Sequence, residues 1–242
     1  MEPGWANEAL EELGYIGKRQ VHEYGHVILE DMMGSELSIV NSARLSFNQR
    51  SVELTSKDQG LINFLMRERH STPFESIEFQ FDVKAPLFIV REWQRHRLSS
   101  FNEWSARYSE IDEEYYVPAR SHVREQHGKP GAYTFESIQD VEVVDDAIYH
   151  IERSQKEAFR TYHYLMEKGI AKEVARTVLP VGMYTRMKYK ANLRSILNFL
   201  SLRNQPHAQL EIQEFAVALE ELITEQIPFV MEKWVEHGRK PI

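Results

Sequence analysis

An alternation of apolar and polar residues at 77–84 constrains the fold more than any other feature of this sequence. Its apolar members are Ile77, Phe79, Phe81 and Val83, and its polar members are Glu78, Gln80, Asp82 and Lys84. A period of two is typical of a β-strand with one buried face. Pro86 follows at once, and proline favours the first position of a helix. We therefore predict a strand at 77–84 and a helix that starts at Pro86.

Other patterns along the chain predict further strands and helices. Strands are expected at 26–32 and 185–190. Helices are expected at 35–46, at 60–70, in a long amphipathic stretch that ends at Gly169, at 191–203, and from Pro206 to a break at Pro228.

Two stretches are predicted to lie outside these elements. Residues 121–133 contain Gly128, Pro130 and Gly131, and we interpret them as a linker or flexible loop. Residues 1–20 are interpreted as an N-terminal extension, with one or two helical turns around 8–13. The 242 residues suit one large domain. We predict an α+β (mixed α/β) fold in a single compact domain, 1–242, with a small sheet flanked by long helices.

Composition excludes several classes of protein. The net charge of −8 argues against non-specific nucleic-acid binding, which needs a dominant positive field. No apolar run is long enough to span a membrane, and the first residues have neither a basic start nor an apolar core. We therefore expect a cytoplasmic protein without nucleic-acid or membrane partners. The chain has no cysteine, which excludes disulfides and any thiolate nucleophile.

The segment 91–109 carries the strongest signal of function. Arg95, His96, Arg97 and Arg107 lie among acids, hydroxyls and aromatic residues. Arginine presents a planar, permanently charged set of donors that matches phosphate and carboxylate oxygens. A solvated basic helix end is the ordinary alternative. The apolar framing favours instead a folded pocket for a small anion, because these residues should draw the segment inward: Trp93, Leu98, Phe101, Trp104 and Tyr108.

The predicted helix at 191–203 has an apolar face bordered by polar residues. Leu193, Ile196, Leu197 and Leu200 share the apolar face at 100° per residue. Asn192 and Arg203 fall on one flank, and Arg194 and Asn198 fall on the other. This arrangement suits a helix that packs inward and binds a ligand along its edges, although periodicity alone fits an ordinary amphipathic helix equally well.

Two other motifs point to competing functions. His22-Glu-Tyr-Gly-His26 matches the His-Glu-x-x-His pattern of zinc hydrolases, which requires a helix that places the histidines one turn apart. Gly25 and the apolar residues after His26 favour a strand, so we expect no metal site there. No Gly-x-Gly-x-x-Gly occurs, and a Rossmann-type dinucleotide site is therefore unsupported.

The arginine segment resembles the signature of the flavin-dependent thymidylate synthases. In that signature Arg95, His96 and Arg97 are followed, after seven residues, by Ser105. The resemblance extends over roughly 38–228 and includes the segments 42–47, 70–75, 175–180, 192–203 and 207–209. It implies an α/β unit that assembles as a homotetramer, with each active site at a junction of subunits.

The resemblance also implies roles for individual residues. Positions that would hold flavin adenine dinucleotide are Thr72, Arg95, His96, Arg97, Glu103, Asn192, Leu193, Arg194 and Asn198. Positions that would surround the deoxyuridylate are Glu92, Trp93, Gln94, Arg95, Glu103, Trp104, Ser105, Ala106, Arg107, Arg176 and Arg203. His207 and Gln209 match further polar positions near the flavin.

Three of these positions have more particular implications. Arg203 matches the residue that polarises the uracil ring, and we assign it the catalytic role. Glu92 stands where some relatives have glutamine, and it can accept from the deoxyribose hydroxyl or from a neighbouring arginine. Ala106 stands where others have glycine, so its methyl group should matter little unless the backbone needs a positive φ angle.

The implied activity is reductive methylation of dUMP to dTMP. FAD is the expected cofactor, and NADPH and 5,10-methylenetetrahydrofolate are the expected co-substrates. Hydride chemistry of this kind belongs to the flavin, while the protein supplies placement and electrostatics. A nucleotide-binding or regulatory module without catalysis remains the main alternative, and a zinc hydrolase is a third.

Overall fold

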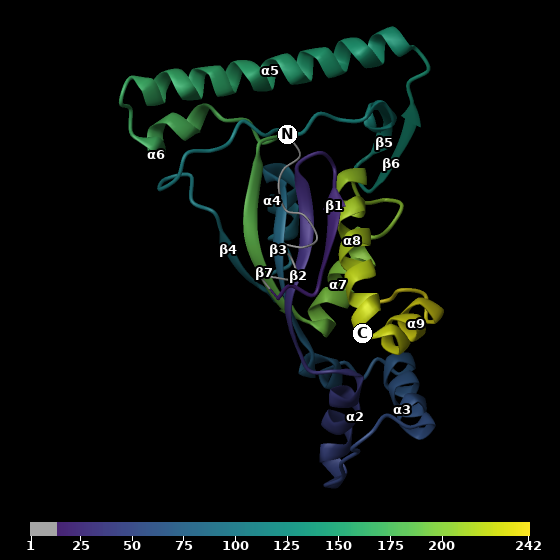
Figure 1. Cartoon of the computed structure of the whole chain (residues 1–242). Helices are drawn as coiled ribbons and strands as arrows, with labels where there is room; N and C mark the ends of the chain where they lie inside the picture. The colour runs from purple at the N-terminus through teal and green to yellow at the C-terminus, as the bar shows by residue number, and fades with distance from the viewer. Residues whose placement is uncertain (1–13) are drawn as a thin grey trace. The chain divides into compact units, whose positions relative to one another are not determined.

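The structure is a computed structural model, and it describes residues 14–242 (Figure 1). The chain divides into two compact units, each packed mainly against itself. The first unit comprises residues 14–85, 89–103 and 186–242 of the described chain, and the second comprises 86–88 and 104–185. In sequence, the second unit is therefore an insertion into the first.

A five-stranded sheet forms the centre of the first unit (Figure 1). Its strands, in spatial order, are β1 (Gly17–Val21), β2 (Gly25–Met33), β3 (Glu78–Pro86), β7 (Tyr184–Asn192) and β4 (Ser100–Glu103). β1 pairs antiparallel with β2, β2 with β3, and β4 with β7. The predicted strands at 26–32, 77–84 and 185–190 are confirmed.

Helices α7 (Leu193–Arg203) and α8 (Leu210–Gln226) supply the core against the apolar face of this sheet. The rings of Trp93 and Phe199 stack with centroids 4.7 Å apart, and Tyr189 of β7 lies 5.4 Å from Trp93. Phe215 of α8 completes the cluster, 6.2 Å from Trp93. Aromatic pairs of this kind contribute about 0.5–1.5 kcal/mol beyond the area that they bury.

The other face of the sheet carries a charged cluster centred on Asp82, which is 1% exposed. Arg186 Nε donates to both Asp82 carboxylate oxygens, at 2.7 and 2.9 Å. Lys188 Nζ and His26 Nε2 each lie 2.9 Å from the same carboxylate. Burial alone would raise the pKa of Asp82, but hydrogen bonds from these three residues lower it well below the ordinary value. The cluster therefore joins β2, β3 and β7 through one ionised side chain.

The remaining helices of the first unit are α2 (Glu36–Arg44), α3 (Ser56–Arg67), α4 (Leu87–Trp93) and α9 (Pro228–Glu236), of which α4 begins in the second unit. Asp58 ties α2 to α3, because its carboxylate accepts from Arg44 at 2.5 Å and from the Thr55 hydroxyl at 2.6 Å. Short 3-10 turns follow at Leu45–Phe47 and Thr72–Ser76.

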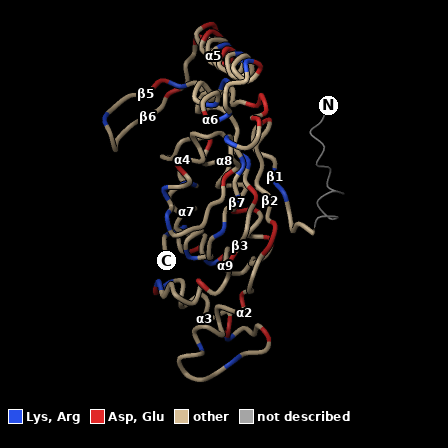
Figure 2. The backbone as a smooth tube through the Cα atoms, turned by 90° about the vertical axis from the view of Figure 1, so that its left-hand side faces the viewer, with Lys and Arg blue, Asp and Glu red and all other residues tan. Residues whose placement is uncertain are grey.

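The second unit consists of a long helix, a hairpin and short turns. Helix α5 (Val141–Glu167) packs Phe159 and Tyr162 against Ile111 and Met183. The Tyr162 hydroxyl also accepts from the Ile111 backbone N–H at 3.2 Å. Helix α5 carries both acidic and basic positions (Figure 2). The other elements are η3 (Arg120–His122), β5 (Arg124–Lys129), β6 (Ala132–Ser137), α6 (Lys172–Ala175) and η4 (Arg176–Val178).

Mixed α+β content is confirmed, but the prediction of a loop at 121–133 is wrong. Most of this stretch belongs to the antiparallel hairpin β5–β6, whose residues are almost all exposed. Gly128 and Gly131 have φ angles of +95° and +84°, which L side chains rarely adopt. The glycines that suggested a loop therefore form the tight end of a hairpin.

Several predicted boundaries differ because capping residues decide them. The helix predicted at 60–70 begins at Ser56, since Thr55 accepts from the Asp58 N–H. The helix predicted at 191–203 begins at Leu193, because Asn192 ends β7 and caps α7. The helix predicted from Pro206 begins at Leu210, and Pro228 starts the unpredicted α9.

Two further differences concern strands. β4 was not predicted. Residues 17–20, placed in the extension, belong to β1, and the helical turns expected at 8–13 lie outside the described residues. The single domain, 1–242, stays a prediction.

Replacing Asp82 by asparagine should lower the free energy of unfolding by about 1–3 kcal/mol, because Arg186 and Lys188 lose their shared carboxylate. A carboxyl group whose pKa is lowered by folding stabilises the folded state at pH values above its ordinary pKa. This stabilisation is lost as the pH falls below about 4. Burial also lowers the pKa of His26. The stability that neutral His26 contributes is therefore also lost as the pH falls, starting below about pH 6.5. Urea denaturation at pH 7, pH 5 and pH 2.5 separates the two effects, because the His26 contribution falls between the first two values and the Asp82 contribution falls only toward the last.

Glu78→Gln is the matched control, because Glu78 lies on the same strand and its side chain is 33% exposed in its ion pair with Lys190, whereas Asp82 is buried. It should change stability by less than about 0.5 kcal/mol. Equal losses in the two variants would contradict the role given to Asp82.

Candidate active site

The arginine segment leaves the core at the end of α4. Trp93, the last residue of α4, is fully buried against Phe199. The chain then turns, and the His96 N–H donates to the Trp93 carbonyl at 3.0 Å. Arg95 and Arg97 are exposed on either side of the half-buried His96. The buried tryptophan thus anchors a turn whose charged side chains face outward, as predicted for a helix end followed by a loop.

Arg203, the last residue of α7, reaches this turn. Its Nε donates to His96 Nε2 at 3.1 Å, and one terminal nitrogen donates to the Glu92 carboxylate at 3.0 Å. The other terminal nitrogen lies 3.4 Å from the Glu92 carbonyl oxygen. Glu92 therefore pairs with a neighbouring arginine, which is one of the two roles open from the sequence.

The electrostatic environment keeps His96 neutral. Burial lowers its pKa to about 4, and the positive charges of Arg203 and Arg95 lower it in the same direction. A neutral imidazole has one acceptor nitrogen, which here is Nε2 because Arg203 donates to it. The ring edge packs on Phe199, with centroids 4.9 Å apart.

A cavity of about 630 Å³ opens beside this cluster, within the first unit. Figure 2 shows basic positions near the end of α4 and along α7. The cavity is lined by Arg95, His96, Arg97, Leu98, Ser99, Ser195, Asn198, Leu202 and Arg203. Five of these were predicted as site residues from the sequence. A volume of this size suits a small-molecule ligand, and the lining favours an anionic one.

A second group of predicted residues lies at the other end of α7. Asn192 Oδ1 accepts from the Ser195 N–H at 2.9 Å and so caps the helix. Arg194 pairs with Glu75 at 2.6 Å, and Glu75 shares its 3-10 turn with the exposed Thr72. Leu193 is fully buried, and its N–H donates to the Ile77 carbonyl. The Leu193 side chain therefore belongs to the core.

Gln94 and Glu103 connect the turn after α4 with the edge strand. Gln94 Nε2 donates to a Glu103 carboxylate oxygen at 3.2 Å. Glu103 is exposed and is the last residue of β4. Both predicted residues therefore border the same part of the first unit.

Five predicted residues belong to the second unit instead: Trp104, Ser105, Ala106, Arg107 and Arg176. The Ser105 hydroxyl accepts from the Arg107 N–H at 3.3 Å within a tight turn. Arg107 lies 3.4 Å from Glu173 of α6, and Arg176 directly follows α6. Two exposed arginines thus occur close together in this unit, on the turn and at the end of the short helix.

Ala106 is compatible with its turn. It is 7% exposed and packs in the core of the second unit. It is not among the residues with a positive φ angle, so its methyl group causes no backbone strain.

The sequence predicted that five apolar and aromatic residues around the arginines would be buried, and this prediction is confirmed for some of them and wrong for others. Trp93 is buried, and Phe101 and Trp104 are partly buried. Leu98 and Tyr108, however, are 78% and 77% exposed. Both lie outside helices and strands next to the arginines, and Leu98 is part of the cavity lining.

Sequence reasoning missed Ser99, Ser195 and Leu202 in the cavity lining. Ser195 lies one turn before Asn198 on the same flank of α7, so helical spacing would have identified it. Ser99 and Leu202 show no pattern that separates them from ordinary surface residues.

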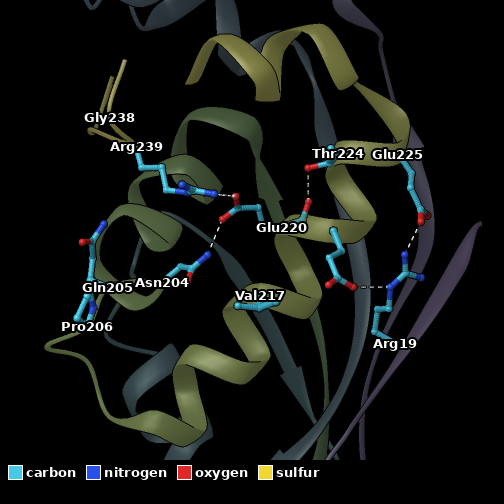
Figure 3. Close-up of a pocket in the computed structure, with 11 residues that line it drawn as sticks. Arg19, Asn204, Gln205, Pro206, Val217, Glu220, Thr224, Glu225, Gly238 and Arg239 are labelled. Carbon is cyan, nitrogen blue, oxygen red and sulfur yellow. Dashed lines mark hydrogen bonds and ion pairs between the residues drawn. The ribbon is translucent and has the colours of Figure 1, made fainter. Parts of the chain in front are cut away.

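A larger hollow of about 910 Å³ lies beside α8 in the first unit (Figure 3). Its charged side chains neutralise one another. Glu220 accepts from Asn204 at 2.6 Å and from Arg239 at 2.8 Å, while Arg19 pairs with Glu221 and Glu225 (Figure 3). Asn204 directly follows Arg203, so this network holds the end of α7 against α8.

The His-Glu-x-x-His motif lies in the β1–β2 hairpin. His22 has a φ angle of +57° in the turn, and His26 contacts Asp82. A side chain at Gly25 would lie 2.5 Å from the Val21 carbonyl oxygen, which explains the glycine. Within residues 14–242 no cluster of three potential metal ligands occurs. Across the same residues, no helix is long and apolar enough to cross a membrane.

The sequence matches one family model and is similar to proteins that share one name. The family model described as thymidylate synthase complementing protein matches residues 27–229. A flavin-dependent thymidylate synthase from Thermotoga neapolitana is 41% identical over 223 residues, which cover 92% of this chain and 96% of that protein. One from Thermus thermophilus is 38% identical over 217 residues, covering 90% and 78%.

The fold is similar to that of a solved structure. The UMP/dUMP methylase PolB from Streptomyces cacaoi, bound with 5-Br dUMP, superposes with a TM-score of 0.82 at 35% sequence identity. The match covers 93% of this chain and the whole of that chain.

Proposed function

The chain belongs to the flavin-dependent thymidylate synthases, and we propose that it methylates dUMP to dTMP at the arginine-lined cavity of the first unit. The observation that carries this proposal is the pair of hydrogen bonds by which Glu92 and His96 hold Arg203 at the wall of that cavity. A cation held at a fixed place can stabilise negative charge that develops on a pyrimidine ring.

The donor set of the cavity fits FAD. Arg95 and Arg97 offer exposed guanidinium groups for phosphate oxygens, and Asn198 and Ser195 offer neutral polar groups on the same helix. Thr72, Asn192 and Arg194 extend the polar surface to the start of α7. When bound, the flavin would supply hydride transfer, which no protein side chain provides.

Ring activation would rest on Arg203, because the chain has no cysteine to attack the pyrimidine. Its guanidinium group would face the O2/N3 edge and stabilise charge there, which makes C5 more nucleophilic. 5,10-Methylenetetrahydrofolate would provide the carbon and NADPH the reducing equivalents. These assignments, and a cytoplasmic location, are parts of the proposal.

Arg107 and Arg176 would bind the phosphate of dUMP. Both are exposed, and Glu173 lies 3.4 Å from Arg107, so part of their charge is already balanced. We propose a homotetramer in which each site draws residues from more than one copy. The family resemblance supports such an arrangement, because it implies a homotetramer with each active site at a junction of subunits.

Purified protein should therefore have the mass of four chains by light scattering. A sample diluted until it dissociates should lose dTMP formation, because single copies lack part of the site. A stable monomer with full activity would contradict the shared site.

The function itself is tested by colour and turnover. The purified protein should be yellow, should bind FAD, and should oxidise NADPH faster when dUMP is present. With methylenetetrahydrofolate it should form dTMP. A nucleotide-binding regulator has no reason to retain flavin, so a colourless protein that consumes no NADPH would favour that alternative. The same assay is repeated with UMP in place of dUMP. A faster reaction with UMP would make UMP, rather than dUMP, the proposed substrate.

Arg203→Ala should lower the rate of dTMP formation by about 10²–10³, which is typical for one lost electrostatic contact at a reacting group. FAD should stay bound, since Arg95, Asn198 and Arg194 remain. Ser105→Ala should be milder, because this hydroxyl would orient ligand and form no covalent bond. Mass spectrometry that found a uracil adduct on Ser105 during turnover would overturn this scheme.

A further inference from the structure

We propose that Glu92 and His96 are positioning residues that act on the reaction through Arg203. This inference rests on the proposed function. Both residues were expected to contact ligands directly, Glu92 the nucleotide and His96 the flavin. The contacts assign them a different task, which is to hold one guanidinium group at a defined place in the cavity wall.

The guanidinium group of Arg203 is held on three sides. Its Nε and both terminal nitrogens each have an acceptor, from the His96 ring, the Glu92 carboxylate and the Glu92 carbonyl. Arginine has five N–H donors, so two remain for a ligand. The side chain of Arg203 is only 18% exposed, and that of Glu92 is 28% exposed. A flexible side chain that must act on a small ring is thereby limited to one orientation.

His96 is suited to this task because it stays neutral. A protonated imidazole would turn a donor toward Arg203 and repel it. Burial and the neighbouring arginines prevent this at neutral pH, since they lower the pKa of His96 to about 4. Phe199 packs against the imidazole ring, with centroids 4.9 Å apart, while Nε2 accepts from Arg203.

Glu92 can act on Arg203 in two ways, through its charge and through the position of its carboxylate oxygen. Its carboxylate balances the charge of Arg203, while its oxygen orients a terminal nitrogen. A glutamine oxygen at this position would orient equally well without the charge. Asn204, the residue after Arg203, is held separately by Glu220, which also accepts from Arg239 (Figure 3). The two acceptors therefore determine the direction of the side chain rather than the fold of the helix.

The test is a double-mutant cycle on the full-length, FAD-loaded enzyme. Glu92→Ala and His96→Asn should each lower kcat by up to about 10²-fold, with a smaller effect on KM for dUMP. Glu92→Gln should recover most of the rate lost in Glu92→Ala. In an Arg203→Ala background, neither change should lower kcat by more than about twofold, because the group that they position is gone.

Glu221→Gln is the matched control. Glu221 lies on α8, outside the cavity, and is one of the two carboxylates that pair with Arg19 of β1, so the change removes the charge of one acidic partner of another arginine. Its small effect on kcat should be the same with Arg203 or alanine at position 203. Losses from Glu92→Ala and His96→Asn that multiply with the Arg203→Ala loss would overturn the proposal, since both residues would then act independently.

A second measurement does not depend on turnover. Nitrogen-15 NMR of labelled histidine should show His96 as the tautomer with a proton on Nδ1. Arg203→Ala should raise the pKa of His96, because Arg203 lowers it, while Glu221→Gln should not. An unchanged pKa would overturn the positioning contact. Absence of dTMP formation in the unmodified protein, with the NMR result as expected, would reject the proposed function and leave the contact intact.

Discussion

The packing of Trp93 on Phe199 is the contact on which the candidate site depends. It joins the end of α4 to the middle of α7, and both rings are fully buried. Every charged group of the cavity lies within a few residues of one of these two rings, on a turn or a helix end. Because close packing in the core tolerates little displacement, the charged groups at the edge of this contact are held in fixed positions. An apolar contact thus determines the geometry of a polar site.

The arrangement of charge explains how an acidic protein can hold an anionic ligand. The net charge of −8 describes the whole chain, whereas a ligand responds to the groups within a few ångströms. Arg95, Arg97 and Arg203 line one cavity. Within residues 14–242, Arg203 alone of the three contacts a carboxylate, that of Glu92. The charges around the larger hollow are paired with one another instead. The smaller cavity is therefore the better site, although its volume is less.

Strands and helices with regular periodicity could be predicted from the sequence, because burial on one face leaves a readable pattern. β3 and α5 are examples. The hairpin β5–β6 could not, since nearly all its residues are exposed and its glycines resemble those of a loop. For the site, motifs identified the residues but not their partners. Glu92 and Arg203 are separated by 111 positions, and only the fold shows that they meet.

The second unit enters and leaves the first through neighbouring strands. Glu103 ends β4 and pairs with Met187 of β7, so the two ends of the inserted segment are adjacent. A segment whose ends already meet can change in length at small thermodynamic cost, roughly 0.6 kcal/mol for each doubling. Within this segment the exposed hairpin β5–β6 is the place where added residues would disturb least, because the turn of Ser105 and Arg107 and the end of α6 at Arg176 lie outside it. The second unit thus combines a hairpin whose length can change with turns whose positions the proposed site requires.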